Sequence, residues 1–278
     1  MVRSEMPSEA QTIQWYPGHM ARAMRRLADD LALIDLVIEV VDARLPRTGR
    51  NPALARIAAR NRRLVVLSRT DLAAADATER WLVHLRDAGE EAVALDAKSP
   101  ASFTRLRQAL GALAGEARRG RVIVLGIPNA GKSTVINGLI GRAVARTADT
   151  AGITRAAQWF RVRATPGRAA DPAAGWLEVM DTAGILVPKI DTPEAQWKLA
   201  LVGAVPRSRF DPEDVVAEFF TWAAAHDYAA VPSLEAFAQT RGFVRHGTQT
   251  DTHNAAWAYI KDFNESRLGR MTLEEPAQ

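Results

Sequence analysis

Runs of hydrophobic residues recur along the first part of the chain and alternate with stretches of helical periodicity. The runs at 35–42, 63–67 and 92–95 are each followed by a helical stretch, and further runs lie at 121–125 and 176–180. Continuous hydrophobic runs of this length are typical of strands buried on both faces. We therefore predict an α/β fold with a mostly parallel sheet and helices on both of its faces.

Beyond Pro188 the pattern becomes helical throughout. Asp211 is suited to cap a helix and Pro212 to occupy its first position, so we predict that a helix begins there. Three more helices are predicted at 194–205, 233–240 and 252–266.

The large hydrophobic residues of these helices fit a core better than base-stacking platforms, because they recur on one helix face. They are Val215, Val216, Phe219, Phe220, Trp222, Ala256, Ile260 and Phe263. We predict two domains: an α/β domain with an N-terminal arm at 1–190, and a small all-helical domain at 191–278.

Residues 126–133 read Gly-Ile-Pro-Asn-Ala-Gly-Lys-Ser and fit the phosphate-binding pattern G-x-x-x-x-G-K-[ST]. Its glycines let backbone N–H groups wrap the phosphates, while the lysine and the hydroxyl meet the terminal phosphate and Mg²⁺. The alternative is a Gly-rich turn with an incidental lysine. Only five of the 36 Lys and Arg residues are lysines, however, so Lys132 is poorly explained as filler. The predicted phosphate contacts are Pro128, Asn129, Ala130, Gly131, Lys132, Ser133 and Thr134.

The run at 176–180 leads directly into Asp181-Thr-Ala-Gly184. At such a place a carboxylate can hold a Mg²⁺-bound water and a glycine N–H can meet a γ-phosphate. In the polar stretch 147–154, Thr154 is the predicted ligand of the metal, and Thr150 is the second choice. The alternative is that this stretch is a plain surface loop in which neither threonine contacts the metal. The predicted Mg²⁺ ligands are Ser133, Thr154 and Asp181, and Gly184 is predicted to contact the nucleotide.

Two segments suited to reading a nucleotide base come before the phosphate loop. The first, Ser68-Arg69-Thr-Asp71, also fits a helix-capping turn, but its place at the end of a predicted strand favours ligand binding. Asp71 can accept two hydrogen bonds from guanine, a pattern that adenine does not offer. In the second segment, Asp96-Ala97-Lys98-Ser, the Ala97 N–H can meet the guanine oxygen and the Lys98 stem can cover the base. This order of segments indicates a circularly permuted GTPase.

Composition sets outer limits on the class of protein. The 278 residues are 47% hydrophobic, enough to bury a full core, and the formal charge of +4 permits an anionic partner. Zero cysteines exclude disulfides, thiol catalysis and Cys-based zinc modules. The sequence shows neither a signal-peptide core nor a membrane-length hydrophobic run, so we expect a cytoplasmic protein without membrane contact.

Motif blocks occur in one order along nearly the whole chain: 13–20, 41–44 (Val-Asp-Ala-Arg), 50–52, 64–67, 96–99, 126–134, 152–154, 158–159, 181–186 and 268–273 (Leu-Gly-Arg-Met-Thr-Leu). In these blocks the chain resembles the YlqF (RbgA) family of bacterial ribosome-biogenesis GTPases. The resemblance implies a permuted GTPase domain followed by a small helical domain that contacts ribosomal RNA. It also implies a role in late maturation of the large (50S) ribosomal subunit, with GTP hydrolysis stimulated by the particle.

The chain departs from the family pattern at several positions. Ser68 and Arg69 replace an Asn-Lys pair, which removes an amide that ties the motif to the phosphate loop, so we expect weakened rather than abolished guanine selectivity. Ala151 and Ala183 replace prolines, and we expect these changes to loosen two loops. At one further position the chain follows the resembled family: Ile185 stands where many other GTPases place the glutamine that orients water, so in-line attack needs another organiser.

His19 is one candidate organiser, because its turn can swing the imidazole towards the γ-phosphate when a partner docks. The alternative is that it only pins the N-terminal arm to the core, together with Trp15 and Tyr16. The predicted catalytic residues are His19, Lys132 and Thr154. Asn129 is a candidate K⁺ ligand, as in related permuted GTPases, or it simply braces the phosphate loop.

Arginines near both ends of the chain are candidates for RNA contact, because their planar guanidinium groups donate paired hydrogen bonds to phosphate. They are Arg22, Arg25, Arg26, Arg241, Arg245, Arg267 and Arg270. The preferred hypothesis is GTP hydrolysis coupled to large-subunit maturation. The alternative is an RNA-binding assembly scaffold that retains nucleotide weakly and does not turn it over.

Overall fold

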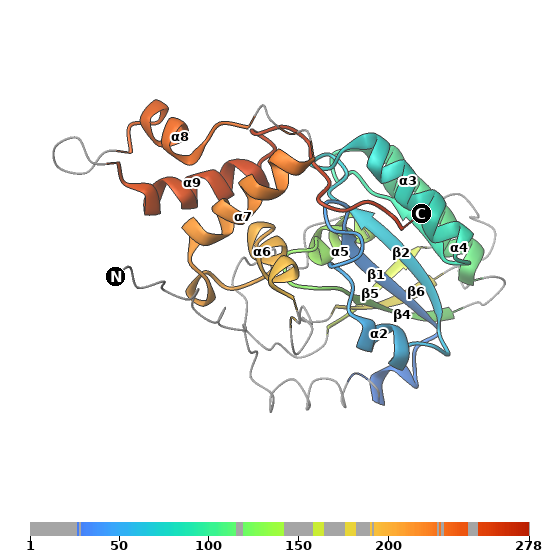
Figure 1. Cartoon of the computed structure of the whole chain (residues 1–278). Coiled ribbons are helices and arrows are strands. Elements are labelled where there is room, and N and C mark those ends of the chain that lie inside the picture. Colours follow the sequence, from blue (N-terminus) through green and yellow to red (C-terminus); the bar gives the residue numbers. More distant parts are fainter. Residues whose placement is uncertain are drawn as a thin grey trace.

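The computed structural model describes residues 27, 29–114, 119–141, 158–163, 176–181, 190, 192–226, 228, 231–243 and 250–277. An α/β part and a group of helices lie side by side, and they are joined near the carboxyl edge of the sheet (Figure 1). Within the described residues, no helix is both long and apolar enough to cross a membrane.

The six strands in the described residues form one sheet at the centre of the α/β part, in the order β3-β2-β1-β4-β6-β5. The strands are β1 (Leu36–Asp42), β2 (Arg62–Ser68), β3 (Glu91–Ala94), β4 (Arg119–Leu125), β5 (Gln158–Arg163) and β6 (Trp176–Asp181). Neighbouring strands are parallel except that β5 pairs antiparallel with β6 at one edge. The predicted strands are found within one or two residues of their expected ends.

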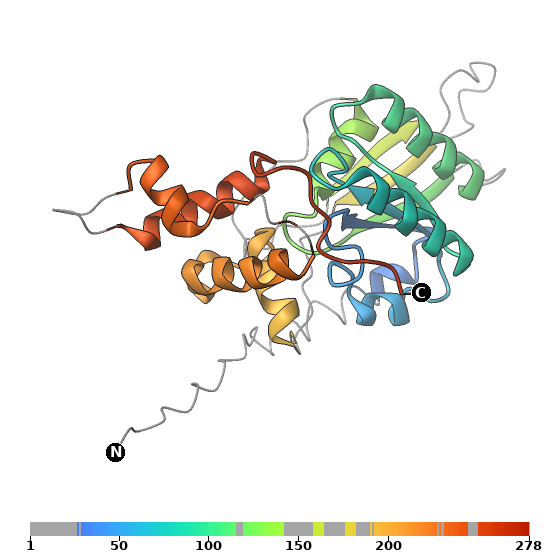
Figure 2. The ribbon, with the colours of Figure 1, turned by 45° about the horizontal axis from the view of Figure 1, so that its top comes forward.

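Helices cover both faces of this sheet, as the continuous hydrophobic runs predict. Alternate residues of β1 face opposite sides: Ile38 and Val40 belong to the same hydrophobic cluster as Leu106 and Leu110, whereas Val41 packs with other neighbours. On one side lie α4 (Pro100–Ala114) and α5 (Lys132–Ile140), and on the other α2 (Pro52–Ile57) and α3 (Ala75–Asp87). The view in Figure 2 shows the helices above and below the strands.

The helical group consists of α6 (Pro193–Leu201), a short 3₁₀ turn (Arg207–Arg209), α7 (Pro212–Ala225), α8 (Leu234–Thr240) and α9 (Thr252–Asn264). Side chains of Thr192, Asp211, Ser233 and Asp251 accept hydrogen bonds from the first turns of these α-helices. Phe219 of α7 is fully buried and contacts the Tyr259 and Phe263 rings of α9.

The fold class is confirmed, with a P-loop α/β part and a helical C-terminal region. The helix predicted at 194–205 ends earlier, because the chain turns at Gly203 and the Ala204 N–H bonds back to the Leu199 carbonyl. One hydrophobic cluster runs from the sheet into α6, α7 and α9. The division into domains at residue 190 stays a prediction.

Candidate nucleotide site

The segments predicted to bind nucleotide lie at one edge of the sheet. Asp42 at the end of β1 is in register with Ser68 at the end of β2, and Leu67 with Ala94 at the end of β3. On the other side β4 pairs with both β1 and β6, so that Asp181 is in register with Val124. Because these strands are parallel, their carboxyl ends meet at the edge where open α/β sheets bind ligands.

The phosphate loop connects β4 to α5 in a tight turn. Gly126 has φ of 153°, and a Cβ there would lie 2.3 Å from the Val40 carbonyl oxygen, so only glycine fits against β1. Gly131 adopts φ of 92° and caps α5. The first N–H groups of α5 have no partner within the helix, and they carry its positive dipole end, which suits phosphate.

Lys132 begins α5, and its side chain folds back over the loop. Its Nζ donates to the Ile127 carbonyl oxygen at 2.8 Å, and the residue is 8% exposed. Ser133 and Thr134 follow in the first turn, half-buried. The loop therefore places an ammonium group, hydroxyls and backbone N–H groups together, which is the donor set that a nucleoside triphosphate requires.

Ser68 joins the predicted base-reading segment to the phosphate loop. Its hydroxyl lies 2.5 Å from the Ala130 carbonyl oxygen and 3.1 Å from the Val41 carbonyl oxygen, and the residue is buried. A hydroxyl has one proton, so it serves these two acceptors alternately or shares the proton between them. The serine thus forms a contact to the phosphate loop, although the family pattern places an amide at this position.

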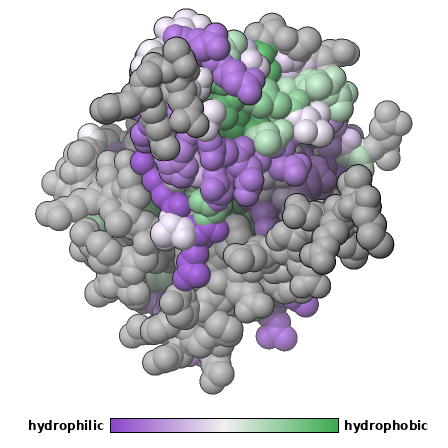
Figure 3. Space-filling view, turned by 60° about the vertical axis from the view of Figure 1, so that its left-hand side comes forward, coloured by the Kyte–Doolittle hydropathy of each residue, from purple (hydrophilic) through white to green (hydrophobic). Residues whose placement is uncertain are grey.

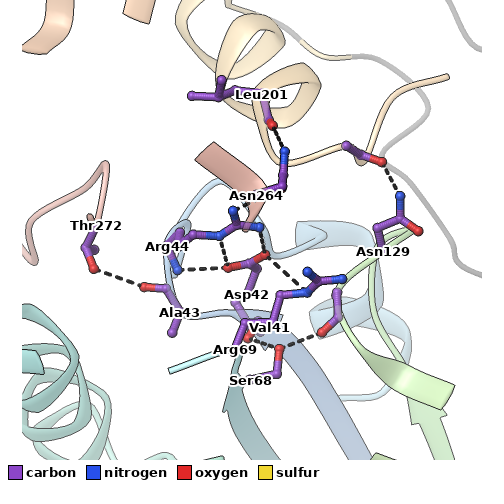
Figure 4. A network of polar contacts seen from close by, with 12 residues as sticks. Val41, Asp42, Ala43, Arg44, Ser68, Arg69, Asn129, Leu201, Asn264 and Thr272 are labelled. Carbon is purple, nitrogen blue, oxygen red and sulfur yellow. Dashed lines mark hydrogen bonds and ion pairs between the residues drawn. The ribbon is translucent and has the colours of Figure 1, made fainter. Parts of the chain in front are cut away.

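Arg69 adopts a left-handed conformation, with φ of 56°, which is uncommon for a residue with a long side chain. Its Nε lies 3.8 Å from Asp42 Oδ2 and, among the described residues, is buried without a hydrogen-bond partner (Figure 4). The side chain leans towards the end of β1, where its charge adds to that of Arg44 beside the Asp42 carboxylate.

Asp71 and Lys98, from the two segments predicted to read the base, form an ion pair. Lys98 Nζ lies 2.7 Å from Asp71 Oδ2, and the Lys98 backbone N–H donates to Asp96 Oδ1 at 2.8 Å. The hydrogen bond to Asp71 and its charge raise the pKa of Lys98, which is itself exposed. The turns after β2 and β3 are therefore in contact, as the guanine-reading hypothesis requires.

A buried ion pair lies directly behind this edge (Figure 4). Arg44 donates to both carboxylate oxygens of Asp42, at 3.0 Å from Nε and 2.7 Å from Nη2, and both residues are about 1% exposed. Burial alone would raise the pKa of Asp42, but the charge and hydrogen bonds of Arg44, with the charge of Arg69, outweigh it and hold the pKa below its usual value.

Arg44 also joins the sheet to the helical group. Its Nη1 donates to Asn264 Oδ1 at 3.0 Å, and its guanidinium lies over the Phe263 ring. Asn264 in turn donates to the carbonyl oxygen of Leu201, the last residue of α6, at 2.7 Å. The sequence shows Val41 to Arg44 as a motif block but predicts no role for it, because a charged pair in a sequence does not reveal whether it is buried.

Asn129 forms a second link from the phosphate loop to the helices. Its Nδ2 lies 2.5 Å from the Gly203 carbonyl oxygen, just beyond α6, and its backbone adopts φ of 59° (Figure 4). In this structure the side chain thus braces the loop against the helical group. That contact agrees with one of the two roles predicted for it, and leaves the K⁺ role a prediction.

Several predicted site residues lie outside the described residues: His19, Thr154, Gly184, and the arginines Arg22, Arg25, Arg26 and Arg245. The same holds for the side chain of Asp181, whose backbone ends β6. Of the other arginines, Arg241 and Arg267 both pair with Asp262, and Arg270 is exposed. Seen from the helical end, the described surface is largely hydrophilic, with a smaller hydrophobic area (Figure 3).

Comparisons with known proteins agree with this geometry. A family model described as "50S ribosome-binding GTPase" matches residues 121–209. Ribosome biogenesis GTPase A of Bacillus cereus is 32% identical, with 96% of this chain and 95% of that protein covered. The protein of the same name from Priestia megaterium is 31% identical, with 96% and 98% covered. The crystal structure of GNP-bound YlqF from T. maritima matches with a TM-score of 0.71 at 25% identity, covering 92% of this chain and 99% of that one.

The fold and the site together define a circularly permuted P-loop GTPase, in which the strand before the phosphate loop is the fourth of the described strands. The chain belongs to the YlqF (RbgA) family, the ribosome biogenesis GTPases A. The family resemblance inferred from its motifs is thereby confirmed, and so is the assignment as a GTPase of ribosome biogenesis.

Proposed function

We propose that this GTPase acts in late maturation of the large ribosomal subunit and that the particle stimulates its GTP hydrolysis. The observation that carries the proposal is the contact between Ser68 and Ala130, because it places the base-reading turn against the phosphate loop. One bound nucleotide can then span both. The family description and the names of the relatives support the ribosomal partner.

In the proposed site, Asp71 accepts two hydrogen bonds from the guanine ring, and Ala97 donates its N–H to the guanine oxygen. Lys98 must release Asp71 and lay its stem along the base, which is feasible because its side chain is 79% exposed. Lys132 leaves the Ile127 carbonyl for the β- and γ-phosphates. The backbone N–H groups of residues 129–134 and the hydroxyls of Ser133 and Thr134 supply the remaining donors at the positive end of α5.

The oxygen donors of Ser133, Thr154 and Asp181 suit Mg²⁺, which prefers hard oxygen ligands and usually retains waters. Two observations support the fit: Ser133 lies in the first turn of α5, and β6 delivers Asp181 beside β4. When bound, the ion would neutralise charge that develops on the phosphates. A K⁺ ion beside Asn129 would require this side chain to leave the Gly203 carbonyl.

We propose that His19 orients the attacking water when the particle docks, because Ile185 has no group that can do so. The ordered GTP form, with Thr154 and Gly184 at the γ-phosphate, would grip the particle, and hydrolysis would release it. Exposed arginines, Arg270 among the described ones, would contact ribosomal RNA phosphates.

The direct test is to measure γ-phosphate release with and without purified large ribosomal subunits. We expect subunits to raise the rate, and Lys132→Ala to abolish hydrolysis in both conditions. Lys261→Ala is the matched control, because it removes an exposed lysine of α9 far from the loop in sequence. A Lys132→Ala protein as active as the wild type would contradict the enzyme assignment. Binding to subunits without any turnover would favour the scaffold alternative.

A further inference from the structure

The last described segment of the chain returns from the helical group to the α/β part. Beyond α9 the chain crosses the carboxyl edge of the sheet and ends beside α3, as both ribbon views show (Figures 1 and 2). Residues 271–274, named here the C-terminal strap, are each buried, with Leu273 at 1% exposure. The strap includes the end of the motif block at 268–273, to which no role has so far been given.

The strap is hydrogen-bonded to the residues that directly follow Asp71. The Met271 N–H donates to the Leu72 carbonyl oxygen at 3.1 Å, and the Ala74 N–H donates to the Thr272 hydroxyl at 3.2 Å. These bonds fix the chain just after Asp71, and the hydrogen bond of Ser68 to the phosphate loop fixes it just before Asp71. The turn that carries Asp71 is thus fixed at both ends, and one of those ends is fixed by the C-terminus.

Glu274 anchors the other end of the strap. Its buried carboxylate accepts from the Arg47 N–H at 2.7 Å, the Thr48 N–H at 3.1 Å and the Thr48 hydroxyl. The indole N–H of Trp81 donates to its carbonyl oxygen at 2.9 Å. Hydrogen bonds to an ionised acceptor are stronger than neutral ones, and a buried carboxylate is costly without them. Glu274 therefore sets the position of the strap along the sheet edge.

We propose that the C-terminal strap is a positioning element of the guanine site, which holds the turn after β2 so that Asp71 meets the base. This inference rests on the proposed role of Asp71. Because the strap continues from α9, it also connects the helical group covalently to the residues that read the nucleotide. A partner that shifts α9 would then change guanine affinity, and nucleotide would change affinity for that partner equally.

The test compares full-length Glu274→Gln with the wild type by calorimetric titration with GDP and with IDP. Inosine lacks the 2-amino group and so forms one of the two bonds proposed for Asp71. We expect Glu274→Gln to weaken GDP binding about tenfold and IDP binding less, so that the ratio of the two affinities shrinks. The turnover number at saturating GTP should remain unchanged. Glu275→Gln is the matched control, because that neighbouring carboxylate pairs with Arg80 at the surface, and it should bind both nucleotides like the wild type.

Thr272→Val provides a second variant of the same shape if Glu274→Gln fails to fold, since it removes the hydroxyl that accepts from the Ala74 N–H and donates to the Ala43 carbonyl oxygen. It should likewise reduce the preference for GDP over IDP. If these variants lower the melting temperature but leave the preference for GDP over IDP unchanged, the strap only stabilises the fold and the inference is overturned. If the wild type itself does not prefer GDP over IDP, the proposed role of Asp71 fails instead.

Discussion

At the residue scale, the buried pair of Asp42 and Arg44 stabilises the junction between sheet and helices. We predict that Asp42→Asn lowers the free energy of unfolding at neutral pH by about 3–5 kcal/mol, because Arg44 would remain buried without its charged partner. Urea denaturation would measure this loss. The control Asp76→Asn, which affects an exposed carboxylate, should leave the free energy of unfolding nearly unchanged. Equal losses for the two variants would contradict the assigned role.

The same pair makes stability depend on pH. The pKa of Asp42 is lower in the folded protein than its usual value of 3.8, so the unfolded chain binds its proton first. The stabilisation is fully present above the unfolded-state pKa, and is lost as pH falls through the folded-state pKa. Asp42→Asn should therefore flatten the loss of stability in that acid range, measured by thermal unfolding at successive pH values. If the stability of Asp42→Asn falls with pH as steeply as that of the wild type, Asp42 is not the source of this pH dependence.

Ser68 is a second single residue with a defined expectation. Ser68→Ala removes the hydroxyl that contacts Ala130, and we predict about fivefold weaker binding of GTP, in line with about 1 kcal/mol for one hydrogen bond. Thr221→Ala, which removes an exposed hydroxyl bonded within α7, is the matched control. If both variants bind GTP like the wild type, Ser68 does not support the site.

At the element scale, the packing of α4 on α5 sets a constraint that helix propensity alone would miss. Alanine usually stabilises a helix more than glycine does, yet a Cβ at Gly138 would lie 2.0 Å from the Phe103 ring. We predict that Gly138→Ala destabilises the protein by about 1–3 kcal/mol through overpacking, measured by thermal unfolding. Adding Phe103→Leu should recover part of the loss, and a stabilised single variant would contradict this packing.

Elements differ in how well the sequence predicts them. The strands were found because buried runs in a parallel sheet are continuous, and Asp211 with Pro212 located the start of α7. The end of α6 was missed, because a Gly203 turn within an apolar stretch leaves no break in periodicity. Contacts such as that of Glu274 with Thr48 were not predictable, since a polar residue near a chain end looks like a solvated one. In the site, the spacing of the motifs predicted Ser68 and Asp71 as site residues. Their hydrogen-bond and ion-pair partners could be identified only from the folded structure.

At the scale of the whole molecule, Arg44, Asn129 and the strap join the helical group to the sheet. Arg270, one of the arginines proposed to contact RNA, is exposed. We predict that the affinity for large subunits falls steeply with salt concentration. Arg270→Ala should weaken binding and reduce the slope of log affinity against log salt by about one, because one phosphate contact is lost. Arg80→Ala, which removes an exposed arginine of α3, is the control. An affinity for large subunits that does not change with salt concentration would contradict an interface made mainly of contacts to RNA phosphates.

The central claim is that the turn after β2 and the loop after β4 bind opposite ends of one guanine nucleotide. The most direct measurement is the affinity of wild-type and Asp71→Asn proteins for GTP and XTP. Asparagine can donate to the 2-oxygen of xanthine, so the variant should lose about a hundredfold in GTP affinity and prefer XTP. Unchanged preference for GTP in the variant would show that Asp71 does not read the base.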